Sequence, residues 1–435
     1  MLCHQSSLRL NRCIHASNGS TVLFASFRCF VSSGAMQMQK EPQANICQPI
    51  TTCTRTEIMN FQNKTFDDIR KQQLTKLVPR IEKIEIKYKG RGISDSAVMY
   101  MNKHLSTPHH CALHISKTVA DSAVLALVTP NDENNSLLQA KPHSGKEVLA
   151  KDDTEPQPIP WDMHRPLPFN CKLEILNFNM PQSTQWHHDL VNKIYWQSCA
   201  MILGAVIQEA FKENYSIGLY KLPHISVNRG AFCYDVITEE SLRDWKPQER
   251  DLIFLTKIAR SIISKNLKFE RLEVDRESAI KMFNNNRFQL DRISNILRDK
   301  KEDAKISLYR FGQYIDISNG PHISNTSHIY HYVVTAVHKL KFEEDADMCP
   351  WRIQALSLPQ NLKVHHAVWS MLENRARKLV KENLPHPPVG NDEAQSYVMS
   401  GSIENETKEY MKSTGQWREG IWKKTEDVLK PTIEP

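Results

Sequence analysis

The stretch Tyr195–Gly204, YWQSCAMILG, is the middle of a longer segment, 188–212, in which apolar residues recur at helical spacing. That spacing is carried by Leu190, Ile194, Ala200, Ile202, Leu203, Val206, Ile207 and Phe211. An apolar pattern of this length predicts a long helix that is buried for most of its course. We therefore expect a core helix here.

Shorter elements are expected on both sides of this helix. Strand-like runs lie at 81–88, 98–101, 124–128, 172–178, 217–222, 231–237, 269–274, 306–311, 314–317 and 330–340. Apolar spacing predicts further helices at 66–77, 250–266, 277–283 and 362–383. Another helix should begin at Ser106-Thr107-Pro108, because a Ser or Thr N-cap followed by proline suits a first helical turn. The strands are grouped rather than strictly alternating with helices, which is typical of the α+β class.

Three polar stretches interrupt this pattern. The arm 41–63 shows no clear periodicity, and it leads into the short helix that ends before Pro79. The segment 129–160 is rich in Pro, Asn, Asp, Glu, Lys and Ser, which predicts a flexible surface insertion. The tail after Pro385 is polar and weakly patterned, although 417–429 could become helical on a partner.

The first forty residues have the composition of a targeting segment. They contain no acidic residue, and their arginines at 9, 12 and 28 lie among Ser, Leu, Phe and Cys. This composition predicts a mitochondrial transit peptide over 1–40. A secretory signal is the alternative, with 21–31 as its apolar core, but Arg28 interrupts that core.

Length, charge and cysteine content narrow the class of protein. The 435 residues predict two to four domains, and the net charge of +7 favours contact with phosphate without requiring it. The 10 cysteines show no Cys-x-x-Cys spacing, which indicates reduced thiols rather than a disulfide framework. No stretch has the uninterrupted apolar length of a membrane span. No nucleotide fingerprint or zinc ligand set occurs either, so no cofactor and no metal site are expected.

Three segments resemble a TGS domain, the small β-grasp module at the front of threonyl-tRNA synthetase. They are Met101–Pro108 (MNKHLSTP), Ala126–Val128 (ALV) and Trp161–Leu167 (WDMHRPL). The resemblance implies a β-grasp domain over 80–178, with the flexible segment 129–160 inserted in it.

A second set of segments resembles the editing domain of the same enzyme. Tyr195–Gly204 matches its long helix, Ala231–Asp235 (AFCYD) matches a core strand, and Tyr314–Ile323 (YIDISNGPHI) matches its Gly-Pro-His turn. The resemblance implies an editing-like α+β domain over 183–341. The remainder, 342–435, would be a C-terminal extension with the amphipathic helix and the polar tail.

The catalytic positions of this editing domain are changed. In the family, hydrolysis of a serine wrongly esterified to threonine tRNA uses two helix histidines, four residues apart, with a cysteine and a histidine on the turn. The matching residues here are Gln197, Met201 and Ser318, and only His322 is retained. Glutamine and methionine cannot take a proton at neutral pH, and losing one acid–base group typically costs ~10²–10⁴-fold in rate. We therefore expect an inactive site with no catalytic residue.

The chain also resembles a family that combines these two modules without a synthetase core, the mitochondrial large-subunit ribosomal proteins numbered thirty-nine. After Leu340, fewer than ~100 residues remain, too few for an aminoacylation domain. The segments most similar to the ribosomal family are 161–163, 195–201, 230–236, 312–317, 334–338, 357–359 and 362–383. The insertion 129–160 and the tail after Pro385 depart from the family pattern, which leaves their roles open.

The ribosomal resemblance implies a structural constituent of the mitochondrial large ribosomal subunit, located in the matrix. Its partners would be the large-subunit rRNA and neighbouring ribosomal proteins, with no small-molecule substrate. Two basic clusters are candidates for RNA contact: Lys83, Lys87, Lys89, Arg91, Arg375, Arg377, Lys378 and Lys381. Such contacts would read phosphate and shape, although a solvated charged face is the plainer interpretation of each cluster.

Two other interpretations stay open at this point. The first is a free-standing deacylase that hydrolyses mischarged seryl-tRNA, and Cys199 with His322 would then be a conceivable nucleophile and base. A buried helical cysteine is more often a small core residue, however. The second is a regulatory or assembly factor that binds tRNA or a synthetase without being a ribosomal subunit.

Overall fold

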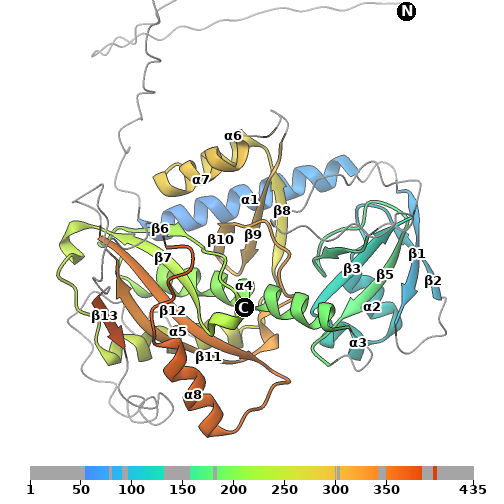
Figure 1. Cartoon of the computed structure of the whole chain (residues 1–435). Coiled ribbons are helices and arrows are strands. Elements are labelled where there is room, and N and C mark those ends of the chain that lie inside the picture. Colours follow the sequence, from blue (N-terminus) through green and yellow to red (C-terminus); the bar gives the residue numbers. More distant parts are fainter. Residues whose placement is uncertain are drawn as a thin grey trace, which may run out of the picture. The chain divides into compact units, whose positions relative to one another are not determined.

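The computed structural model describes residues 54–77, 81–90, 97–131, 157–179, 184–298, 300, 304–340, 349–384 and 395–398. They form three β-sheets with helices packed on them (Figure 1), which confirms the α+β class. The predicted transit peptide, Arg91, most of the insertion 129–160 and the segment 417–429 lie outside the described residues.

The first sheet has five strands. They are β1 (Lys83–Lys89), β2 (Ala97–Asn102), β3 (Leu125–Pro130), β4 (Ile159–Trp161) and β5 (Cys171–Leu176). Their order is β2-β1-β5-β3-β4, and β1 and β5 run parallel whereas all other neighbours are antiparallel. β3 and β4 include the first and last residues of the expected insertion 129–160, so the prediction of a flexible segment was wrong at both of its ends.

Two short helices, α2 (Pro108–Ile115) and α3 (Lys117–Ser122), pack against one face of this sheet. The start of α2 confirms the prediction. The Thr107 hydroxyl accepts a hydrogen bond from the His110 amide at 3.3 Å, and Pro108 is the first helical residue. Buried side chains of β1 and β5, such as Ile86 and Leu173, meet those of α2 in this small core.

The second sheet also has five strands. They are β6 (Ile217–Lys221), β7 (Phe232–Thr238), β11 (Ile329–Lys339), β12 (Cys349–Pro359) and β13 (Gln395–Val398). The order is β13-β11-β12-β7-β6, with antiparallel pairing throughout. Neither β12 nor β13 was predicted. β12 nevertheless lies at the centre of the sheet, beyond the expected 183–341 range.

Alternation along β12 places two kinds of side chain on its two faces. Trp351 and Ile353 belong to the large apolar core, with the long helices α4 (Gln185–Ala210) and α5 (Glu249–Ser264). Arg352 and Gln354 point to the other face, where they bind the segment around α8 (His366–Ala376). α4 thus confirms the predicted core helix, since most of its side chains from Val191 onward are buried.

The third sheet is small, and α1 (Arg55–Leu77) lies beside it (Figure 1). Its strands are β8 (Glu270–Val274), β9 (Ile306–Phe311) and β10 (Tyr314–Ile317), in the antiparallel order β10-β9-β8. Helices α6 (Arg276–Phe283) and α7 (Arg287–Leu297) complete an apolar core with α1. The described part of the chain also contains the 3₁₀ turns η2 (Val227–Arg229), η3 (Glu240–Leu242) and η4 (Thr326–His328).

The prediction for α1 was wrong at its start, because the helix begins eleven positions before Phe66, at Arg55. The Arg55 guanidinium donates hydrogen bonds to four carbonyls at the end of α4, those of Gln208, Phe211, Lys212 and Tyr215. Gln62 donates to the Met282 carbonyl at 3.0 Å. These polar tertiary contacts fix the first half of α1, and apolar spacing does not reveal them.

The prediction for α8 was too long, because a helix over 362–383 was expected. The carbonyls that would continue the helix are used by side chains of β12 instead. Gln354 donates to the carbonyls of Ala376 and Lys378, each at 3.0 Å. Arg352 donates to the carbonyls of Val380, Glu382 and Asn383. The chain after Ala376 therefore follows the sheet rather than the helix axis.

One helix qualifies the expectation that no stretch suits a membrane span. Among the described helices, α4 alone is long and apolar enough by length and composition. However, 78% of the relevant window is buried inside the protein, as is typical of a core helix.

Candidate functional site

The residues that match the editing positions gather where the middle of α4 meets the turn after β10. The His322 ring is fully buried between two hydroxyls. Its Nδ1 lies 3.0 Å from Ser198 Oγ, and its Nε2 lies 2.8 Å from Ser318 Oγ. Both ring nitrogens are therefore occupied by neighbouring side chains and cannot accept a proton from a bound water. We call Ser198, Ser318 and His322 the histidine site.

Burial also makes His322 a weak base. Desolvation lowers the pKa of its imidazole from 6.5 to about 4, so the ring is neutral at physiological pH. The ring stacks on Phe269, with centroids 5.3 Å apart, and meets the edge of Tyr309 at 4.5 Å. A neutral, enclosed imidazole with both nitrogens bonded is a structural group.

The turn that carries His322 needs glycine at one position. Gly320 has a φ of +59°, and a Cβ atom there would lie 1.8 Å from the Tyr309 hydroxyl oxygen. Tyr309 cannot move away easily, because its hydroxyl donates to Asp162 Oδ2 at 2.8 Å. Asp162 also accepts the His322 backbone N–H at 2.8 Å. The buried Asp162 carboxylate thus ties the loop after β4 to this turn.

The other editing positions do not supply a base. The Gln197 amide lies 3.5 Å from Ser318 Oγ, and Met201 is fully buried one turn further along α4. Burial raises the pKa of the Cys199 thiol to about 12, so the thiolate form that a nucleophile needs is disfavoured. Cys199 contacts Tyr195 and Ser357 rather than His322. The geometry does not support Cys199 and His322 as a catalytic pair.

A buried carboxylate beside the histidine site is also fully engaged. Asp316 accepts hydrogen bonds from the hydroxyls of Tyr234 and Tyr314 at 2.8 and 3.2 Å. Gln289 donates to it at 3.1 Å, and Arg292 lies 3.4 Å away. Both nitrogens of His322 and both oxygens of Asp316 thus have partners from the protein, although the buried Gln289 Oε1 has none.

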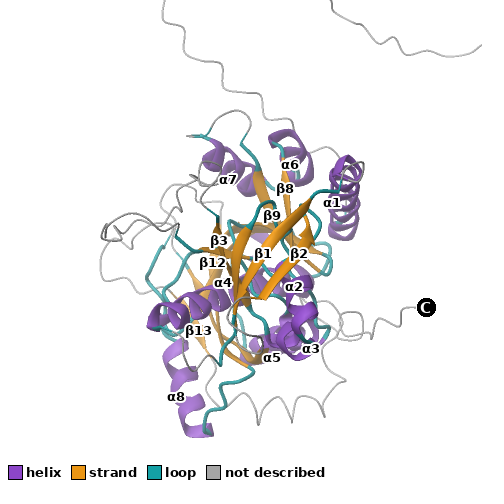
Figure 2. Cartoon of the chain, turned by 90° about the vertical axis from the view of Figure 1, so that its right-hand side faces the viewer, coloured by secondary structure: helices purple, strands orange, loops and turns teal. Residues whose placement is uncertain are grey.

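The first basic cluster lies on the open face of the first sheet. Lys83, Lys87 and Lys89 alternate with buried residues along β1 and are exposed. Lys83 donates to the Asn102 side chain at 2.6 Å, and Lys87 lies 3.4 Å from Glu85. Figure 2 shows β1 and β2 in the foreground. The structure thus places these three lysines together on one surface.

Sequence reasoning missed an aromatic residue on this face. Tyr100 of β2 is 69% exposed, and strand register places it opposite Glu85, between Lys83 and Lys87 on the neighbouring strand. Exposed aromatic rings beside cationic side chains are the usual platform for stacking unpaired nucleobases. Alternation along the predicted strands 81–88 and 98–101 was the signal that could have drawn attention to Tyr100, once their antiparallel pairing is known.

The second basic cluster is less uniform. Arg375 donates to the Asn228 carbonyl and packs over Gly230, and Arg377 donates to the Asn374 side chain at 2.8 Å. Lys378 and Lys381 are exposed, but they follow the end of α8. The four residues therefore do not form one helical stripe, because the helix stops at Ala376.

No group of three or more metal-ligating side chains occurs among the residues that the structure describes. No family model matches the chain. Its sequence is similar to that of threonine–tRNA ligases. It is 28% identical to the human cytoplasmic threonine–tRNA ligase 1 over 289 residues, 66% of this chain and 32% of that enzyme. It is 29% identical to the ligase of Thermotoga petrophila over 177 residues, 41% of this chain and 24% of that enzyme.

The chain is thus similar to threonine–tRNA ligases over about a third or less of their length. A second similar protein is matched over far more of its own length. The chain is 29% identical to the large ribosomal subunit protein mL39 of Drosophila melanogaster over 339 residues, 78% of this chain and 89% of that protein. The predicted resemblance to this ribosomal protein and to the synthetases is confirmed.

Proposed function

We propose that this chain is a structural constituent of the large ribosomal subunit of mitochondria and does not hydrolyse mischarged tRNA. The observation that carries the proposal is the similarity to mL39 over 89% of that protein's length. The acid-free, arginine-bearing first forty residues support import into mitochondria. The deacylase alternative has less support, because the synthetase relatives match over only a third of their length.

The proposal also divides the chain into domains that resemble those of threonyl-tRNA synthetase and a C-terminal extension. Residues 80–178 are a TGS-like β-grasp domain, and residues 183–341 are a degenerate editing-like domain. The extension 342–435 adds β12 and β13 to the sheet of the editing-like part. The parallel pair β1 and β5, with antiparallel neighbours and a helix on one face, supports the first assignment. Burial of α4 against β7 and β12 supports the second.

The absence of editing activity rests on the histidine site. A hydrolytic site needs a positioned water and a group that takes its proton. His322 is neutral and bonded at both nitrogens, while Gln197 and Met201 cannot accept a proton. We infer that the site is a packing element that holds the turn after β10 against α4.

We further propose that the open face of the first sheet contacts rRNA. Lys83, Lys87 and Lys89 would bind phosphates, and Tyr100 would stack on an unpaired base. Lys378 and Lys381 are a second candidate contact, and neighbouring ribosomal proteins would cover other parts of the surface.

The first experiment is quantitative mass spectrometry of mitochondrial ribosomes sedimented through a high-salt gradient. We expect recovery of this chain in the large-subunit peak at the same stoichiometry as established subunit proteins. Salt-labile or substoichiometric recovery would instead favour an assembly factor. Absence from the peak, together with hydrolysis of seryl-tRNA by the purified chain, would establish the deacylase alternative.

The RNA contact is tested with the full-length recombinant chain and a short single-stranded RNA. Tyr100→Ala should weaken binding by roughly 5- to 100-fold, because stacking on one aromatic ring is worth ~1–3 kcal/mol. Tyr100→Phe should bind like the wild type. Tyr330→Ala removes another exposed tyrosine, 55% accessible on β11, and serves as the matched control. Equal loss in both alanine variants would count against a specific platform.

A further inference from the structure

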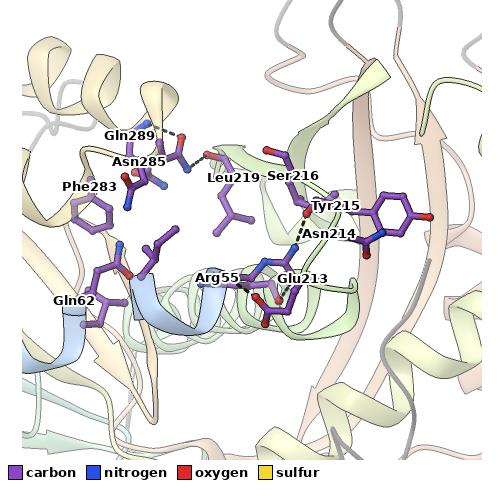
Figure 3. Close-up of a pocket in the computed structure, with 15 residues that line it drawn as sticks. Arg55, Gln62, Glu213, Asn214, Tyr215, Ser216, Leu219, Phe283, Asn285 and Gln289 are labelled. Carbon is purple, nitrogen blue, oxygen red and sulfur yellow. Dashed lines mark hydrogen bonds between the residues drawn. The ribbon is translucent and has the colours of Figure 1, made fainter. Parts of the chain in front are cut away.

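A cavity of about 270 Å³ lies beside the first turns of α1, away from the histidine site (Figure 3). It is bordered by α1, the end of α4, β6 and the connection between α6 and α7. Ile315 of β10 belongs to its lining, whereas the next residue, Asp316, points toward Tyr234 and Tyr314. Strand alternation therefore puts the cavity and the histidine site on opposite faces of β10.

The inner wall of the cavity is apolar and the rim is polar. Leu219, Phe283 and Ile315 are buried and supply the apolar surface. Five other lining side chains carry polar groups that make no hydrogen bond within the part of the chain that the structure describes. They are the amides of Gln208, Asn214 and Asn285 and the hydroxyls of Tyr215 and Ser216. Figure 3 shows Asn285 on one side of the opening and Asn214 and Ser216 on the other.

The charged residues of the lining are committed to each other and to the backbone. Arg55 donates through its guanidinium to four carbonyls, and its backbone N–H donates to Glu213 at 2.8 Å. Glu213 also accepts the Thr56 hydroxyl at 2.8 Å. Among the residues that the structure describes, no further charged side chain lines the cavity. A phosphate, a carboxylate or an ammonium group would therefore lack a free counter-charge, and the matching ligand is neutral.

The cavity thus selects a small neutral group with apolar faces and an edge that both donates and accepts hydrogen bonds. Side-chain amides carry both functions and recognise nucleobase edges for this reason. Unpaired RNA bases are recognised by apolar contact with their faces and hydrogen bonds to their edges. The volume lies just below the range usual for drug-sized ligands, which suits a single base.

We propose that this cavity binds one unpaired base of the large-subunit rRNA, with Asn285 and the amides opposite it reading the base edge. The proposal rests on the proposed ribosomal function. It adds a base-reading contact that is separate from the lysine and Tyr100 surface. It also gives a role to the first half of α1, which completes the cavity wall with Arg55 and Gln62.

The test uses cells in which the endogenous chain is replaced by the wild type, by Asn285→Leu or by Asn284→Leu. Asn284 is the matched control, since it is an exposed asparagine adjacent in sequence and outside the lining. Large subunits are purified, recovery of the chain is measured, and the rRNA is treated with reagents that modify unpaired base edges. We expect one base to become about tenfold more reactive in Asn285→Leu alone, because one good amide–base pair is worth ~5- to 100-fold.

The recovery measurement separates this proposal from the proposed function. Stoichiometric recovery of all three chains, with no base that distinguishes Asn285→Leu, would overturn the base-binding proposal and leave the ribosomal role intact. Absence of the wild-type chain from the subunits would overturn both. Binding of free nucleosides by the purified chain, without any protected rRNA base, would identify a soluble nucleoside as the ligand and would also overturn the rRNA assignment.

Discussion

The histidine site and the cavity beside α1 both lie next to β10, yet their polar groups are used in opposite ways. In the histidine site, each nitrogen of the imidazole and each neighbouring hydroxyl is bonded to another part of the chain. In the cavity, three amides and two hydroxyls are left without partners in the described structure. Polar groups on one face of β10 are thus used for packing, while a polar surface available to a ligand lies on the other face of the same strand.

This difference predicts how much stability each region contributes. Buried polar groups that are bonded to one another become costly when one partner is removed. Replacing polar groups that face a solvent-filled cavity changes the free energy of unfolding only slightly. Substitutions in the two regions should therefore differ by several kcal/mol in their effect on the free energy of unfolding.

The largest effect is expected for Asp162→Ala. This change removes the acceptor for the His322 backbone N–H and the Tyr309 hydroxyl, and it removes one of the two carboxylates beside Arg271, which keeps Glu273 at 3.0 Å. Loss of one partner of a buried ion pair typically costs ~3–5 kcal/mol. Urea denaturation of the recombinant chain measures it. Asp162→Asn should cost less, since the amide oxygen can still accept, and equal losses in the two variants would contradict this account.

The histidine site should also make stability depend on pH. The pKa of His322 is about 4 in the folded chain and near 6.5 when unfolded, so the unfolded chain takes up its proton first as pH falls. The stability that depends on a neutral His322 is fully present above pH 6.5. It is lost between pH 6.5 and pH 4, by about 3 kcal/mol in total. Burial likewise lowers the pKa of His164 and His338 to about 4.

Urea midpoints measured between pH 7 and pH 4.5 test this contribution. In His322→Gln the slope of stability against pH should fall by about 1.4 kcal/mol per pH unit between pH 6 and pH 4.5. His164, His338 and His328, whose pKa values burial also lowers, would contribute to the slope that remains. An unchanged slope would mean that His322 is not held neutral by the fold.

The wall of the cavity depends on the hydrogen bonds of Arg55. Arg55→Ala removes four hydrogen bonds to the carbonyls at the end of α4 and should cost about 2 kcal/mol. Amide exchange should quicken at residues 208–215 and in the first turns of α1, and much less around His322. Arg55→Lys should recover only part of the lost stability, because a lysine ammonium lacks the planar set of donors with which the guanidinium reaches several carbonyls. Full recovery would show that charge alone holds α1 in place.

Sequence reasoning located the histidine site more completely than the cavity, and the reason is physical. Gln197, Ser318 and His322 were identified by their place in motifs, and the structure brings them together. The cavity depends on Arg55 and on the α6–α7 connection, which are far apart in the sequence and show no periodic pattern. Polar tertiary contacts of this kind cannot be deduced from apolar spacing.

The same reason explains which elements were predicted. Strands and helices with strong apolar patterns, such as α4 and β10, were found within a few residues of their ends. β12 was missed because buried Arg352 and Gln354 interrupt its apolar pattern, and their bonds also shorten α8. A buried arginine is compatible with a central strand only because Asp235, on the neighbouring strand, pairs with it at 2.7 Å.

The smallest effect is expected for Asn285→Leu, and this variant tests most directly whether the cavity and the histidine site differ in their contribution to stability. Asn285 is exposed at the cavity rim and bonds to nothing in the described structure, so the change should alter the free energy of unfolding by no more than about 0.5 kcal/mol. Urea denaturation beside Asn284→Leu measures it. A loss as large as that of Asp162→Ala would mean that Asn285 supports the fold as the histidine site does. A near-zero change leaves ligand binding as the property for which an unbonded amide at this position matters.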